Sequence, residues 1–216
     1  MKLMKRTDVV VVLGDLVGSR RATERAALHH RLTGVLDDLN ERWGSDLRVT
    51  AGDEFQGTVP TLGAASAVAL AVRLALLPEH DARHGIGVGQ RRVLDPGTGI
   101  EDGPAWWAAR AAIDDAHALA GRAATRAART VVRVADGTAV AAGPDGALNA
   151  ALLARDELVG RLDARSLSVL RGLLSGRTQK EIAADEGVSP SAVSQRLRHD
   201  ALGVVMTTSS WLEAVR

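Results

Sequence analysis

The sequence has no cysteine, and only 2% of its 216 residues are aromatic. Because thiols are missing, disulfides and thiolate metal sites are excluded, which fits a protein of the reducing cytoplasm. The formal net charge is only +1, so the molecule is not a polycation that coats nucleic acid indiscriminately, and any contact with DNA must be local. The valine run near the N-terminus ends at Gly14, far too early for a signal peptide or a membrane span. We therefore expect a cytoplasmic protein that does not contact a membrane.

Apolar residues make up 46% of the chain, which is enough to build a genuine core. Their spacing predicts strands where β-branched residues run together and helices where leucines recur every three or four positions. The expected order is a strand (8–13), a helix (21–43), a hairpin (47–51 and 55–59), a helix (62–77), a strand (84–93), a helix (103–119) and a strand (130–134). This order predicts an α+β fold of the ferredoxin-like class, in which helices cover one face of an antiparallel sheet.

The composition changes between residues 137 and 146, where glycine, alanine and proline indicate a loop. We place a domain boundary there. The sequence then predicts an N-terminal α+β domain over residues 1–145, a connecting helix over 146–162 and an all-α domain over 163–216.

A helix-turn-helix is predicted within residues 166–198. Thr178 and Glu181 have the spacing of a capping box, which marks the start of a helix. Gly187 can adopt the positive φ of a sharp turn, and Ser189 with the proline after it supplies the N-cap and first turn of a second helix. The pattern therefore predicts two short helices joined by a tight turn.

The second of these helices would turn a polar face outward, because Val193 and Leu197 are four residues apart and face inward. Short polar or bidentate side chains on that face suit phosphates and base edges. The alternative is a helical hairpin used for dimerisation or packing. The predicted DNA contacts are Ser189, Ser191, Ser194, Gln195 and Arg198, together with Thr178 and Gln179 at the start of the preceding helix.

Carboxylates stand where two strands of the predicted sheet end. Asp15 follows the first strand and Asp53 lies at the hairpin tip, two places that a ferredoxin-like sheet brings close together. Such a pair can hold Mg²⁺, which prefers oxygen ligands and retains water or substrate phosphate, and Glu54 would add a third carboxylate. The alternative is that Asp15 only caps a helix and Asp53 only forms a turn. Free amides and a cation at the start of the next helix favour a phosphate, and the predicted phosphate-binding residues are Gly18, Ser19, Arg20 and Gly52.

Gly85, Gly87 and Gly89 alternate along the predicted strand 84–93. They lack the strand-turn-helix context of a dinucleotide fingerprint. We expect them to permit close backbone packing or the approach of a ligand.

Two short motifs resemble the metal motifs of class III nucleotidyl cyclases, GDLVGS at residues 14–19 and TAGDEF at residues 50–55. The GDEF part of the second is also similar to the hairpin of diguanylate cyclases. Residues 177–197 resemble the helix-turn-helix of sigma-like and other bacterial regulators. Over nearly its whole length, including DGPA at residues 102–105, the chain is identified as a member of the SatD family. The cyclase resemblance implies metal binding by Asp15, the Leu16 carbonyl and Asp53, and phosphate binding by Arg110.

Two positions depart from the cyclase pattern. Trp106 stands where cyclases carry a transition-state asparagine, and Val49 stands where they carry the base-selecting lysine. A full cyclase would therefore lack two of its working groups. This favours a transcription regulator that binds double-stranded DNA and senses a nucleotide-like ligand with Mg²⁺ across a homodimer. The alternatives are a divergent Mg²⁺-dependent cyclase or nucleotidyl-transfer enzyme tethered to DNA, and an adaptor whose N-terminal domain only dimerises.

Overall fold

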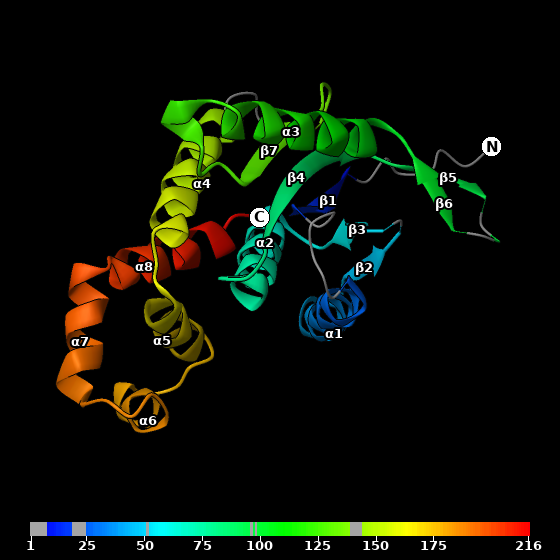
Figure 1. The fold of residues 1–216 in the computed structure, drawn as a ribbon. Coiled ribbons are helices and arrows are strands. Elements are labelled where there is room, and N and C mark those ends of the chain that lie inside the picture. The colour runs from blue at the N-terminus through cyan, green and yellow to red at the C-terminus, as the bar shows by residue number, and fades with distance from the viewer. Residues whose placement is uncertain (1–7, 19–24, 51, 96, 98, 139–143) are drawn as a thin grey trace.

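The computed structural model describes residues 8–18, 25–50, 52–95, 97, 99–138 and 144–216 (Figure 1). Its first half follows the order strand, helix, strand, strand, helix, strand. These elements are β1 (Asp8–Val17), α1 (Arg25–Trp43), β2 (Asp46–Val49), β3 (Glu54–Val59), α2 (Leu62–Leu76) and β4 (Asp81–Gln90). The strands lie in the order β2-β3-β1-β4 and every neighbouring pair is antiparallel, which is the ferredoxin-like arrangement that the sequence predicts.

Helix α3 (Pro104–Ala120) and strand β7 (Thr130–Val134) extend this unit, with a short 3-10 turn at Ala123–Thr125 between them. Strand β7 pairs parallel to β4 at the edge of the five-stranded sheet. A parallel neighbour requires a crossover, and α3 supplies it by passing over the sheet (Figure 1).

Helices cover both faces of the sheet. Side chains alternate along a strand, so Val10 and Val12 of β1 pack in the cluster formed with α1 and α2, whereas Val11 and Leu13 pack against α3. The expectation of helices on one face only is therefore wrong, because the crossover to β7 places α3 on the opposite face.

Close packing between α3 and β4 depends on glycine. A Cβ atom at Gly87 would lie 2.1 Å from the carbonyl oxygen of Ala105, and one at Gly85 would lie 2.3 Å from that of Ala109. Real Cβ atoms do not approach other atoms so closely. Of the two interpretations of this glycine pattern, close backbone packing is confirmed.

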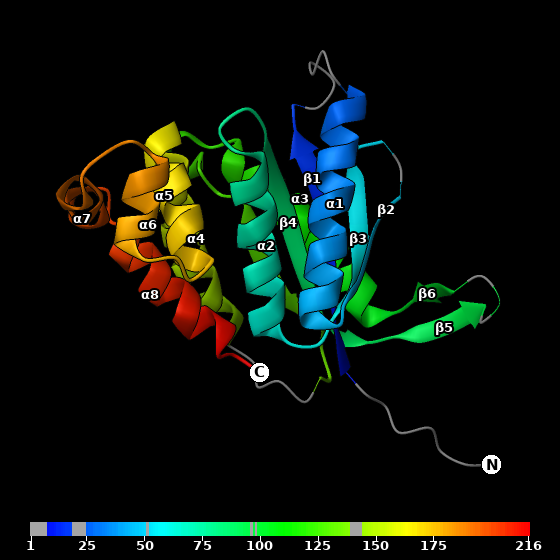
Figure 2. The ribbon, with the colours of Figure 1, turned by 90° about the horizontal axis from the view of Figure 1, so that it is seen from below.

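The predicted strand 84–93 is divided in the structure. Asp8 of β1 pairs with Gln90, the last residue of β4. From Arg92 onward the chain pairs with a different segment, so β5 (Arg92–Asp95) and β6 (Ile100–Asp102) form a separate two-stranded arm. The arm projects beyond the sheet in both ribbon views (Figures 1 and 2).

The C-terminal part of the chain is helical. Helix α8 (Leu202–Glu213) folds back on α2, and the backbone N–H of Gly63 donates to the carbonyl of Val215 at 2.9 Å. Leu70 and Leu74 of α2 belong to the same apolar cluster as side chains of the C-terminal helices, so these helices share a core with α2 (Figure 2). No helix among the described residues combines the length and apolar composition needed to cross a bilayer. The helices are α4 (Pro144–Gly160), α5 (Ala164–Leu174), α6 (Gln179–Asp185), α7 (Pro190–His199) and α8 (Leu202–Glu213).

Candidate functional site

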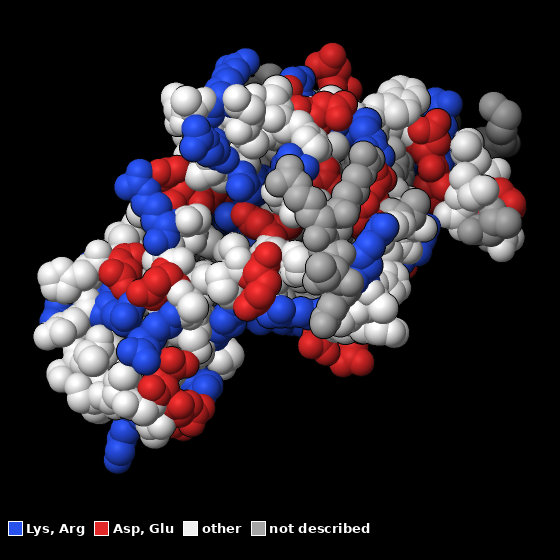
Figure 3. Space-filling view, in the orientation of Figure 1, with Lys and Arg blue, Asp and Glu red and all other residues white. Residues whose placement is uncertain are grey.

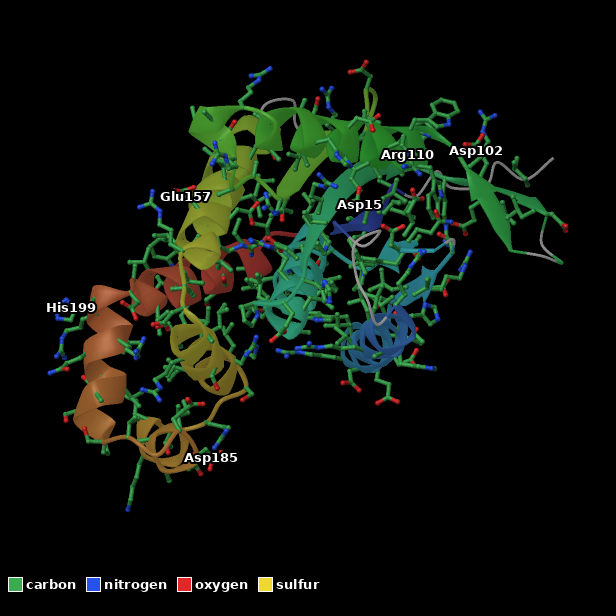
Figure 4. All side chains as sticks on the ribbon, in the orientation of Figure 1. Asp15, Asp102, Arg110, Glu157, Asp185 and His199 are labelled. Atoms are coloured by element: carbon green, nitrogen blue, oxygen red, sulfur yellow. The ribbon has the colours of Figure 1, made fainter. Side chains whose placement is uncertain are left out.

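A cluster of charged side chains lies where α3 crosses the end of β1. Asp15 is aligned across the strands with Glu54 of β3 on one side and Arg83 of β4 on the other. Arg110 and His117 are seven residues apart on α3 and so lie on one side of that helix. Figure 4 shows Asp15 on the sheet beneath α3, the helix that carries Arg110.

Both carboxylate oxygens of Asp15 have partners within the chain. The Nε of Arg83 donates to Oδ1 at 2.9 Å, and the Nε2 of His117 lies 2.7 Å from Oδ2. The Asp15 side chain is 17% exposed, so water screens these contacts only in part. Asp15 is thus held by two basic side chains rather than left open toward solvent.

Arg110 is held much less firmly. Its nearest carboxylate is that of Glu54, whose Oε2 lies 4.0 Å from Nη2, and the two side chains are 55% and 50% exposed. An exposed pair at this distance contributes little to stability. The guanidinium of Arg110 can therefore turn toward an anion without breaking a strong contact.

The hairpin tip lies next to this cluster. The N–H of Leu16 donates to the carbonyl of Asp53 at 3.3 Å, so the end of β1 and the start of β3 are joined. Gly52 adopts a φ of +64° and Gly18 a φ of +74°, both in the left-handed region where glycine is favoured. The structure thus brings together the predicted residues Asp15, Leu16, Asp53, Glu54 and Arg110, with Gly52 next to Asp53 in the chain. Gly18 lies past the end of β1, where a Cβ atom would have nothing within 4 Å, and Ser19 and Arg20 lie outside the described residues.

These residues do not fit a preformed Mg²⁺ site. A divalent cation needs several oxygen ligands that are free of other partners, and both carboxylate oxygens of Asp15 are in contact with Arg83 and His117. Among the described residues, no group of three or more histidine, aspartate or glutamate side chains is arranged to hold a metal ion. Metal binding by Asp15, Leu16, Asp53 and Glu54 stays a prediction, and it would require Asp15 to give up a partner.

Helices α6 and α7 form a second candidate site. The Thr178 hydroxyl accepts from the N–H of Glu181 at 3.3 Å, and the Glu181 carboxylate accepts from the N–H of Thr178 at 2.7 Å, which is the capping box that the sequence predicts. Gly187 has a φ of +63° in the turn. Ser189 caps α7 by accepting from the N–H of Ala192 at 3.2 Å. Local chemistry therefore fixes the start of both helices and the turn between them.

The two faces of α7 differ in polarity. Val193 is fully buried in the cluster that α7 shares with α5 and α8, while Ser189, Ser191, Gln195 and Arg198 are exposed. Ser194 is half-buried, and its hydroxyl accepts from Arg198 at 2.9 Å. In the preceding helix the Thr178 hydroxyl is used in the cap and Gln179 is half-buried. The helix thus presents a polar surface supported by an apolar one.

Charges of both signs surround α7. Arg196 contacts Asp163 at 3.0 Å and Asp200 at 3.3 Å, so its charge is compensated. Within the part of the chain that the structure describes, Arg198 has no carboxylate partner. Acidic and basic side chains also alternate over the C-terminal helices in Figure 3. Arg198 is therefore the cation of α7 best placed for an external anion.

The sequence model of the SatD family matches residues 9–212. The chain belongs to the SatD family. None of the curated proteins compared with this SatD protein matches it.

Several solved structures are distantly similar to this SatD protein. The guanylyl cyclase domain of the RhoGC fusion protein from the aquatic fungus Blastocladiella emersonii is 19% identical, with a TM-score of 0.41 over 50% of this chain and 74% of that chain. A bacterial light-regulated adenylyl cyclase is 14% identical, with a TM-score of 0.44 over 54% of this chain and 42% of that one. A regulator of polyketide synthase expression from Bifidobacterium adolescentis is 16% identical, with a TM-score of 0.27 over 96% and 86%. The ferredoxin-like assignment rests on strand order and register.

Sequence reasoning missed Arg83 and His117 of this SatD protein. Arg83 lies beside Asp15 because of the β1–β4 register, which no local pattern in one sequence specifies. His117 follows Arg110 by two helical turns, a spacing that places both on one side of α3. This spacing indicates a site only when α3 is known to cover the face of the sheet that carries Asp15.

Proposed function

We propose that this SatD protein is a DNA-binding transcription regulator, in which α6 and α7 form a helix-turn-helix and α7 enters the major groove. The observation that carries this proposal is the division of α7 into a buried side at Val193 and an exposed polar side. A polar outer face is common to surface helices, and in α7 it directly follows a tightly capped helix and a turn, which is the layout of a helix-turn-helix. Such an arrangement suits a recognition helix, whose N-terminal part contacts base edges.

Each exposed residue of α7 has a role consistent with its chemistry. Gln195 can read a base edge through its amide, and Arg198 can bind a phosphate or a guanine edge. Ser189 and Ser191 stand at the N-terminus of α7, where backbone amides favour a phosphate. Ser194, Thr178 and Gln179 complete the proposed contact surface. We further propose that two copies bind paired half-sites, as helix-turn-helix dimers do.

We also propose that the cluster under α3 senses a nucleotide-like ligand through its phosphates. Arg110 supports this proposal, because its guanidinium is exposed and its contact with Glu54 is loose. Gly18 and Gly52 are part of this proposed site, and a Cβ atom would meet nothing within 4 Å at Gly18 and only the Arg25 guanidinium, 4.0 Å away, at Gly52. A ligand that binds one arrangement of the dimer better than another would change DNA affinity by that difference in binding free energy.

DNA binding is tested by selecting bound duplexes from a random library with the full chain, followed by affinity measurement on the enriched sequence. Gln195→Ala and Arg198→Ala should each weaken binding by about 1–3 kcal/mol if they contact base edges. Arg48→Ala is the matched control, since Arg48 is an exposed arginine on strand β2, far from α6 and α7 (Figures 1 and 2). Failure to enrich any duplex would refute the proposed function.

Ligand sensing is tested by calorimetric titration of ATP and GTP, with and without Mg²⁺, into wild type and Arg110→Ala. The proposal predicts binding that is lost in the variant and yields no new product by chromatography. Conversion of the nucleotide would instead support the alternative, a divergent nucleotidyl-transfer enzyme.

A further inference from the structure

A groove of about 510 Å³ runs along α2 between α1 on one side and α5 and α8 on the other. These helices lie side by side in the view from below (Figure 2). The groove is on the face of the sheet opposite α3, so it is separate from the charged cluster around Asp15. Its volume is in the range of sites that bind small organic molecules, about 300–1,000 Å³.

The floor of the groove is formed by alanine. Helix α2 is buried at most of its positions, but Ala67, Ala71 and Ala75 retain partial exposure. These residues are four apart and therefore form one stripe along the helix. Leu70 and Leu74 flank the stripe. Because alanine side chains are small, the groove is deeper along this stripe than it would be with larger residues.

The walls add an aromatic ring and apolar side chains. Leu39 and Trp43 line the groove from α1, and Leu174 lines it from α5. The Arg42 guanidinium lies 5.4 Å from the centre of the Trp43 ring. On the α8 side, the hydroxyl oxygen of Ser209 is buried and has no hydrogen-bond partner within the described chain. The groove thus combines apolar walls with a few polar groups, as small-molecule sites do.

A half-buried cation lies at one side. Arg171 donates from Nε to the carbonyl of Leu74 at 2.6 Å and from Nη2 to the carbonyl of Leu77, which fixes its guanidinium beside the groove. No carboxylate of the described residues lies within ion-pair distance of it. Burial, and then the nearby Arg31, lower the pKa of Arg171, and the carboxylates of Glu79 and Glu186 offset this only in part. Two acidic residues, Asp38 and Glu213, also line the groove. Both are exposed, so water and salt screen their charges more strongly than that of the half-buried Arg171.

We propose that this groove binds a small organic anion with a flat apolar body, which lies on the alanine stripe beside Trp43 and directs its acidic group toward Arg171. The groove is built from α1 and α2 of the sheet unit and from α5 and α8, and α8 directly follows α7. A bound molecule would therefore contact α1 and α2 of the sheet unit as well as α5 and α8 of the C-terminal part.

The test is fluorescence titration of the full chain with 8-anilinonaphthalene-1-sulfonate, an aromatic anion of suitable shape. We expect saturable binding at one site per chain. N-phenyl-1-naphthylamine, which lacks the sulfonate, should bind about tenfold more weakly. Ala71→Leu should weaken binding of the anion at least tenfold by filling the floor, and Ala75→Leu serves if that variant fails to fold by circular dichroism.

The matched control is Leu94→Ser, which removes an apolar side chain 62% exposed on the β5–β6 arm. It should leave the titration unchanged. Binding that survives a folded Ala71→Leu or Ala75→Leu variant, or that Leu94→Ser abolishes, would overturn the proposal, as would the absence of saturable binding. Because the titration contains no DNA, its outcome is independent of whether α7 binds DNA.

Discussion

Arg73 lies between two carboxylates, with its own side chain only 1% exposed. Its Nε donates to Asp81 at 2.8 Å and its Nη1 to Asp156 at 2.9 Å. Asp156 also accepts from the backbone N–H groups of Arg129 and Thr130, each at 2.7 Å. One buried network therefore joins α2, β4, β7 and α4, which connects the sheet to the first C-terminal helix.

Asp156→Asn should lower the free energy of unfolding by about 3–5 kcal/mol, because it removes one of the two carboxylates that compensate the buried Arg73 and leaves that charge with Asp81 alone. Asp46→Asn is the matched control, since the Asp46 side chain is 73% exposed and, among the described residues, forms an ion pair only with Arg48. Its effect should stay below about 1 kcal/mol. Urea unfolding measures both, and equal effects would show that the buried network is not stabilising.

His84 supplies a prediction on pH. Burial, and then the nearby Arg73, lower the pKa of His84 from 6.5 to about 3. Between these two values only the unfolded chain takes up the proton, so this residue makes stability fall as the pH falls from about 6.5 toward 3. Above about 6.5 its contribution is constant.

His84→Phe removes this titration while keeping a ring against Phe55, whose centroid lies 5.7 Å from that of His84. Between pH 6 and 4 the variant should lose stability less steeply than wild type, by up to about 1.4 kcal/mol per pH unit. Denaturant unfolding at several pH values measures the two slopes. Parallel slopes would contradict a neutral, buried His84.

At the scale of elements, the contact between α3 and β4 is sensitive to added volume. Gly87→Ala should lower the free energy of unfolding by about 3 kcal/mol, because its Cβ would meet the backbone of α3 at Ala105. Gly34→Ala is the control, since nothing lies within 4 Å of a Cβ on that exposed position of α1. This second change should raise stability by about 0.5–1 kcal/mol. Thermal unfolding of the two variants should therefore shift in opposite directions.

The sequence could predict the elements whose residues specify them locally. Leu28, Leu32, Leu36 and Leu39 recur at helical spacing and are all buried in α1, and the predicted capping box at Thr178 is formed. The position of α3 and the β5–β6 arm depend on contacts between distant segments, which local spacing does not determine. For the same reason, the sequence identifies Asp15 as a site residue but does not identify its partners Arg83 and His117.

At the scale of the whole molecule, α2 belongs to both large apolar clusters. Leu76 packs in the sheet cluster, and Leu70 and Leu74 pack with α5 to α8. We therefore predict one cooperative unfolding transition for the chain, rather than separate melting of the predicted domains 1–145 and 163–216. Tryptophan fluorescence and far-ultraviolet circular dichroism should give coincident curves. Two resolved transitions would show that the C-terminal helices fold independently.

The central claim is that α7 binds DNA, and the salt dependence of affinity tests it most directly. Fluorescence anisotropy on the selected duplex at a series of salt concentrations should show affinity that falls as salt rises, because phosphate contacts release counterions. If Arg198 contacts a phosphate, Arg198→Ala should reduce the slope of log affinity against log salt by about 0.9, while Arg48→Ala on strand β2 leaves it unchanged. Affinity that does not depend on salt, or that responds equally to the two substitutions, would contradict the account.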